Sequence, residues 1–197
     1  MNLLLLSSLF VTLSLHAGPA LPAPAGTGAG STYHASPEAG SVTPTTPLRP
    51  LREWIRDLIR EARRGSATLD RLIRAAESSG AVIYIDEAEA DHRSWGGRTI
   101  FTGASGGYTY LRIELHRLRP NDTAALLAHE LQHTLEIVSS GVTAAEQVGH
   151  LYRRIGVESR GYRERQFDTA AAIRAGRATL AELRHRNVRA PAVTAAE

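Results

Sequence analysis

The sequence predicts one α+β domain, in which helices flank a small antiparallel sheet of about three strands. Three observations predict this fold class. Two segments with helical periodicity come first, three short segments with strand character follow between residues 81 and 117, and three helical segments complete the domain. Helices and strands that occur in separate runs along the chain are typical of α+β domains.

The first two helical segments carry apolar residues at helical spacing. The first is expected to start at Pro47, and its apolar stripe consists of Leu51, Trp54, Ile55, Leu58 and Ile59. The second covers about residues 66–78, with Ser66 as its expected N-cap and Gly80 as its stop.

Three strands are expected next, over residues 81–87, 98–102 and 108–117. The last alternates most clearly, with Leu111, Ile113 and Leu115 on one face, which is typical of a half-buried or edge strand. The glycine-rich segment 103–107 formally matches the G-x-S-x-G nucleophile elbow of serine hydrolases. That elbow needs a helix directly after it, whereas a strand follows here, so the segment is expected to be a hairpin connection.

Three helices are expected in the second half. Asn121 or Asp122 is expected to cap a helix that ends before Gly141 and packs through the face that carries Leu127 and Leu131. Two further helices are expected over about residues 143–155 and 167–185.

The N-terminal segment predicts export. No Arg, Asp or Glu precedes Glu38, and residues 3–15 form an apolar stretch too short to span a membrane. We expect a signal peptide over residues 1–25, a linker rich in Pro, Gly, Ser and Thr over 26–47, and one domain over 48–190. The protein is expected to be secreted or to lie in the periplasm or cell envelope, and to meet a membrane only transiently through its signal segment.

The composition excludes several chemistries. The chain has no Cys, and all 23 basic residues are Arg, so thiol nucleophiles, disulfides and lysine Schiff bases are excluded. Any metal must be bound by His and carboxylates. The formal net charge is only +3, with Arg and Glu interleaved, so we expect no nucleic-acid partner.

The expected central helix contains the sequence His129-Glu130-Leu131-Gln132-His133, an H-E-x-x-H motif. Side chains four residues apart lie on one face of a helix, so both histidines can bind one Zn²⁺ ion in a cleft opposite the packing face. Bound zinc lowers the pKa of water, and Glu130 is placed to accept that water's proton as the general base. His150, Tyr152 and Tyr162 are candidate hydrogen-bond donors to a developing oxyanion.

Over residues 108–140 the chain resembles the zincin metallopeptidases. It does not resemble the metzincins, whose motif continues with Gly and His where this chain has Glu136 and Ser139. The resemblance is to the gluzincin or aspzincin type. It implies a zinc cofactor, a third carboxylate ligand from a later helix, and a peptide or protein substrate that lies along an edge strand, here residues 108–117.

Glu164 and Asp168 are spaced E-x-x-x-D, which is similar to the gluzincin pattern of a ligand followed by an acid that orients a ligand histidine. Of the downstream carboxylates, we expect Asp168 to be the third ligand. Asp168 could instead be a plain helix N-cap, and Glu164, Glu158 and Glu146 remain alternatives. Glu136, one turn beyond His133, is better suited to orienting a ligand. The sequence therefore predicts an exported zinc metallopeptidase. The alternative is a non-catalytic envelope protein, with a structural metal or none, that binds a partner through its sheet edge.

Overall fold

The computed structural model describes residues 46–89, 96–160 and 165–189, so the expected signal peptide and most of the expected linker lie outside the described residues. The described elements follow one another as β1 (Leu48–Pro50), α1 (Glu53–Gly65), α2 (Ala67–Glu77), β2 (Ala81–Glu87), β3 (Gly97–Ser105), β4 (Tyr108–Leu115), α3 (Pro120–Ser139), α4 (Ala145–Ile155), β5 (Val157–Arg160), β6 (Arg165–Asp168) and α5 (Ala170–Arg189). The α+β fold class is confirmed.

The main sheet has four strands in the order β1-β2-β4-β3. It is mixed, because β2 runs parallel to both β1 and β4, while only β3 and β4 pair in antiparallel fashion. The expectation of a purely antiparallel sheet is therefore corrected. β2 is buried along most of its length, as strands in parallel pairs usually are.

The hairpin between β3 and β4 is as expected. Its two turn residues, Gly106 and Gly107, have φ angles of 59° and 80°. Two consecutive positive φ angles give a turn whose twist matches that of the flanking strands, and glycine adopts them without steric cost. Ser105 therefore ends a strand at a hairpin, which excludes the nucleophile-elbow geometry.

Two helix starts differ from the prediction. The segment after Pro47 first forms strand β1, because the Ile83 amide donates to the Pro47 carbonyl and the Leu51 amide donates to the Ile85 carbonyl, both at 2.8 Å. Helix α3 begins at Pro120, and no side chain caps it, so neither Asn121 nor Asp122 is its N-cap.

The expected cap of α2 is confirmed. The Ser66 hydroxyl accepts a hydrogen bond from the Leu69 amide at 3.1 Å.

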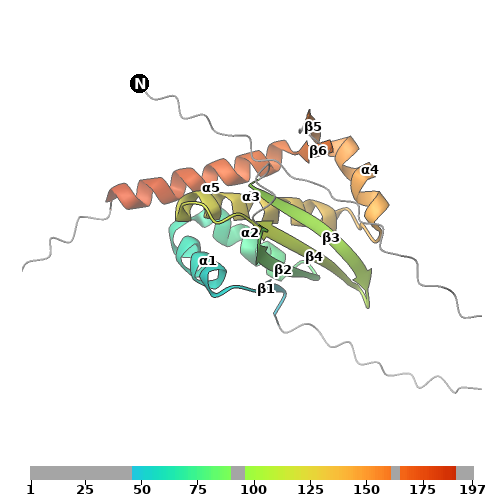
Figure 1. Cartoon of the computed structure of the whole chain (residues 1–197), viewed down its shortest axis with the longest axis horizontal. Coiled ribbons are helices and arrows are strands. Elements are labelled where there is room, and N and C mark those ends of the chain that lie inside the picture. The colour runs from blue at the N-terminus through green and yellow to red at the C-terminus, as the bar shows by residue number, and fades with distance from the viewer. Residues whose placement is uncertain (1–45, 90–95, 161–164, 190–197) are drawn as a thin grey trace, which may run out of the picture.

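Helix α3 is the centre of the domain. It contacts β3 and β4 of the sheet on one side, and α5 lies along another side (Figure 1). All nine residues from Thr123 to Leu131 are buried, so α3 packs on every side and not through one face. The core around it contains Ile83, Ile85, Leu111, Ile113 and Leu115, all fully buried. Among the described residues, none of the helices has the length and apolar character needed to cross a membrane.

Candidate metal centre

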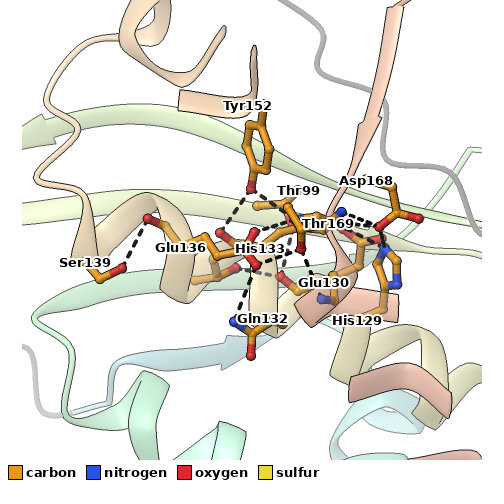
Figure 2. A network of polar contacts seen from close by, with 12 residues as sticks. Thr99, His129, Glu130, Gln132, His133, Glu136, Ser139, Tyr152, Asp168 and Thr169 are labelled. Carbon is orange, nitrogen blue, oxygen red and sulfur yellow. Dashed lines mark hydrogen bonds and ion pairs between the residues drawn. The ribbon is translucent and has the colours of Figure 1, made fainter. Parts of the chain in front are cut away.

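Three side chains converge at the middle of α3. His129 Nε2 and His133 Nε2 lie 3.2 Å apart, and Asp168 Oδ1 lies 3.4 Å from the first and 3.7 Å from the second (Figure 2). Two imidazoles and one carboxylate thus direct one donor atom each toward a common point. These three residues form a group that could hold a metal ion.

The spacing of the donor atoms fits a small divalent cation. Donor atoms bound at about 2.0–2.1 Å to a tetrahedral ion lie about 3.3–3.4 Å from one another. The observed separations of 3.2, 3.4 and 3.7 Å are close to that edge length. Two histidines and a carboxylate are also a donor set that zinc accepts in catalytic sites, where three protein ligands leave a fourth position open.

Asp168 reaches the site from a strand. It is the last residue of β6, and α5 begins only at Ala170, so the expected helix start at residue 167 is corrected. The helix cap is Thr169, whose hydroxyl accepts from the Ala172 amide at 3.0 Å. Because Thr169 caps the helix, the Asp168 carboxylate can face the histidines, and its Oδ1 also accepts a hydrogen bond from the Thr169 amide at 2.7 Å.

Of the other candidate ligands, Glu146 is exposed on α4 and is not part of this group. Glu158 belongs to β5, but its side chain is outside the described part of the structure. Glu164 falls outside the described residues.

Two side chains fix the orientation of His133 through its other ring nitrogen. Its Nδ1 lies 3.0 Å from Glu136 Oε2 and 3.1 Å from the Tyr152 hydroxyl. The remaining oxygen of Glu136 accepts a hydrogen bond from the Thr169 hydroxyl at 2.7 Å. Glu136 therefore has the orienting position expected for it, since a carboxylate on the distal nitrogen holds a ligand histidine in one tautomer and ring orientation.

Neither of the two candidate oxyanion donors that the structure describes, Tyr152 and His150, lies beside the three donor atoms. Tyr152 is buried and contacts the Nδ1 side of His133, away from the Nε2 atom that faces Asp168. His150 is exposed on α4, and Tyr162 lies outside the described residues.

The site is more enclosed than the sequence suggested. His129 is 1% exposed and His133 0%, so the expected exposed pair in a cleft is corrected. The reason is the close packing of α5 on α3 at Gly176, where an added Cβ would lie 3.1 Å from the Ala125 carbonyl oxygen.

Burial and charge shift the two histidines in opposite directions. Burial, followed by the charge of neighbouring His133, lowers the pKa of His129 to about 4. Burial alone would lower the pKa of His133 as well, but its hydrogen bonds with Asp168 and Glu136 raise it to about 9. The carboxylates of Asp168 and Glu136 that raise the pKa of His133 are also the negative charges that would favour a bound cation, which would replace any proton on the ligating nitrogens.

Glu130 lies on the sheet side of the same helix turn. The Thr99 hydroxyl of β3 donates to Glu130 Oε2 at 2.9 Å, whereas Oε1 is buried and has no hydrogen-bond partner among the described residues. Burial raises the pKa of Glu130 to about 7, although the His133 charge and the Thr99 hydroxyl oppose this rise. A carboxylate with a pKa near neutrality and one free oxygen can both accept and return a proton.

The edge strand beside the site is not the one expected. β4, which contains most of the segment 108–117, has β2 on one side and β3 on the other. β3 is the outer strand, and it carries Gly97 and Thr99 against α3. Any peptide added to this side of the sheet would pair with β3.

Comparisons with models of known protein families, with curated proteins and with solved structures give no match. Two residues of the site, Thr99 and Thr169, were not expected from the sequence. For Thr99 a signal exists, since it stands between Gly97 and Phe101 on the face of the strand that these three residues share. For Thr169 the only signal is its position next to Asp168, directly before a helix.

Proposed function

We propose that this chain is an exported, zinc-dependent peptidase in which His129, His133 and Asp168 hold the metal and Glu130 is the general base. The observation that carries the proposal is the convergence of three donor atoms within 3.2–3.7 Å of one another. The general base is adjacent to one of these ligands in the sequence, and its carboxylate has one unpartnered oxygen.

The chain's own residues have separate tasks in this proposal. A bound zinc ion supplies a Lewis acid that polarises a carbonyl group and makes water a better nucleophile at neutral pH. Glu130 Oε1 accepts the proton of the attacking water and later delivers it to the leaving amine. Glu136 and Tyr152 hold the His133 ring, while α5 excludes bulk water from the histidines.

The proposed substrate is a peptide in extended conformation. An outer strand presents unpaired main-chain groups, and an extended peptide can add to them as a further strand. β3 is such a strand, and it contacts the helix that carries the general base. In this arrangement the scissile bond would meet Glu130 near the Gly97 end of the strand.

Zinc loading tests the metal site. The purified protein is loaded with zinc, dialysed and analysed by mass spectrometry for metal content. We expect about one ion per chain in the wild-type protein and less than about a tenth of an ion in the His129→Ala, His133→Ala double variant. Full metal retention by the double variant would contradict the proposed ligands.

Glu130→Gln tests the catalytic role. The amide cannot accept the proton, so turnover of a casein or mixed-peptide substrate should fall by about 10²–10⁴-fold while the zinc content stays unchanged.

A second candidate function is a structural metal clasp in a protein that binds a partner. The burial of both histidines favours it, because structural metal sites are closed. For that protein Glu130→Gln would change neither zinc content nor partner binding, and zinc-loaded wild type would show no peptide hydrolysis.

A further inference from the structure

Strand β3 contributes two positions to the surroundings of the Glu130 carboxylate. Gly97 and Thr99 are two residues apart in a strand, so they lie on the same face of the sheet, and both are buried against α3. Thr99 contributes a hydroxyl group to these surroundings, whereas Gly97 has no side chain that would fill them. The carboxylate lies between these two positions.

The hydroxyl of Thr99 is committed to Glu130. It lies 2.9 Å from Oε2 and 3.1 Å from the main-chain carbonyl oxygen of the same residue. That carbonyl oxygen already accepts from the Thr134 hydroxyl at 3.1 Å. The Thr99 proton is therefore better used by the carboxylate, because hydrogen bonds to a charged acceptor are about twice as strong as those between neutral groups.

Gly97 keeps the other oxygen clear. An added Cβ at this position would lie 3.1 Å from Glu130 Oε1 and 3.0 Å from the Leu126 side chain. A larger residue would therefore displace the Glu130 carboxylate or the Leu126 side chain. The strand thus binds Oε2, whereas Oε1 has no hydrogen-bond partner in the part of the chain that the structure describes.

From this geometry we propose that Thr99 is the positioning residue of the general base. It fixes the rotation of the Glu130 carboxylate so that Oε1, and not Oε2, accepts the proton in the reaction. This inference rests on the proposed function. Without Thr99 the carboxylate can rotate and Oε1 is no longer presented in one direction, which reduces the rate of proton transfer but not metal binding.

The test compares Thr99→Val with Thr99→Ser and Thr134→Val in the zinc-loaded full chain. Valine has nearly the shape of threonine without the hydroxyl, whereas serine keeps the hydroxyl. Thr134→Val is the matched control, because it removes a buried hydroxyl that reaches only the main-chain carbonyl of Glu130. Thr99→Ala carries the same expectation as Thr99→Val and serves if valine is not accommodated.

Kinetics give the first readout. In Thr99→Val, kcat for a casein-derived peptide should fall by about 10- to 100-fold with KM and zinc content unchanged, and Thr99→Ser should restore most of the rate. Thr134→Val should keep the wild-type kcat. A Thr99→Val protein with wild-type kcat, or a Thr99→Ser protein as slow as Thr99→Val, would overturn the proposal.

The second readout does not need activity. In protein labelled with ¹³C at the glutamate carboxyl carbon, the Glu130 resonance is assigned by its loss in Glu130→Gln. We expect this resonance to move in Thr99→Val and to stay near its wild-type position in Thr134→Val. An unmoved resonance in Thr99→Val overturns the inference. If the zinc-loaded wild type hydrolyses no peptide, the proposed function fails, and the resonance alone decides whether Thr99 positions Glu130.

Discussion

Thr169 Oγ1 donates a hydrogen bond to Glu136 Oε1 at 2.7 Å, and this bond joins the segment that carries Asp168 to the helix that carries both histidines. The same carboxylate holds His133 Nδ1 through its other oxygen. Thr169 also caps α5 by accepting from the Ala172 amide. One hydroxyl therefore links the cap of one helix, the orientation of His133 and the position of Asp168.

Thr169→Val should weaken zinc binding without abolishing it. The substitution removes the bond to Glu136, and loss of a partner that orients a ligand typically costs about 10- to 100-fold in metal affinity. It also removes the cap of α5, at a cost of about 1 kcal/mol in the free energy of unfolding. Competition with a chromophoric chelator measures the affinity, and urea unfolding measures the stability. Thr169→Ser should lose much less of both. Equal zinc affinity in wild type and Thr169→Val would contradict this role.

The contribution of the metal to folding can be measured separately. Zinc bound by His129, His133 and Asp168 would connect α3 to β6, and a ligand that binds only the folded state stabilises it by RT ln(1 + [L]/Kd), or about 4 kcal/mol at 1,000 times Kd. We expect zinc to raise the Tm of the wild-type protein and to raise that of Asp168→Asn much less. Asp70→Asn is the control, since Asp70 of α2 pairs with Arg63 and Arg74 and is not part of the candidate metal group, so its zinc-dependent rise in Tm should match that of wild type.

Stability should depend on pH through Glu182, which is not part of the candidate metal group. This α5 carboxylate accepts from the Ser66 hydroxyl at 2.6 Å and from the Thr68 amide at 3.1 Å, at the N-terminus of α2. Burial alone would raise the pKa of Glu182, but the hydrogen bonds from Ser66 and Thr68 hold it below the ordinary value of a glutamate. Its contribution is therefore complete above the pKa of an unfolded glutamate and is lost as the pH falls through the lower folded value.

The variant Glu182→Gln tests the direction of this pH dependence of stability. At pH 7 the variant should be less stable than wild type by about 1 kcal/mol in urea unfolding, and the difference should shrink as the pH is lowered below about 4. Glu61→Gln is a suitable control, because Glu61 is 64% exposed and pairs only with Arg64 of its own helix. A difference that grows toward acidic pH would contradict the assignment.

The parts of the site that follow helical spacing could be predicted from the sequence. His129 and His133 are one helical turn apart, so their convergence needs only that α3 is a helix. The sequence also favours Asp168 as a ligand, but its carboxylate faces the histidines only because Thr169 and not Asp168 caps α5. Both Asp and Thr are common N-cap residues, so the choice between them depends on the tertiary contact between Thr169 and Glu136.

The sheet topology could not be predicted because strand order is a tertiary property. The alternation in β4 identified its buried face, but an interior strand with one covered face has the same pattern as an edge strand. The parallel pairing of β2 depends on β3 taking the outer position, so that β4 inserts between them. For the same reason the sequence predicts that Thr99 belongs to a strand, but not that this strand brings it to Glu130.

The packing of α5 on α3 predicts opposite effects for two helical glycines. At Gly176 an added Cβ would lie 3.1 Å from the Ala125 carbonyl oxygen and 3.5 Å from His129 Cβ, and a main-chain oxygen in a buried helix has little room to move.

At Gly149 of α4, an added Cβ would meet only the mobile end of Arg153, at 3.7 Å. Alanine is favoured over glycine in a helix interior by about 0.8–1.0 kcal/mol. Gly149→Ala should therefore raise the Tm.

In Gly176→Ala the contact with α3 outweighs the helix propensity, so we expect destabilisation by about 1–2 kcal/mol. Because the same contact lies beside His129, Gly176→Ala should also weaken zinc binding, whereas Gly149→Ala should leave it unchanged. Thermal unfolding and chelator competition on the two variants decide the point, and stabilisation by both alanines would show that α5 can move away from α3 at no cost.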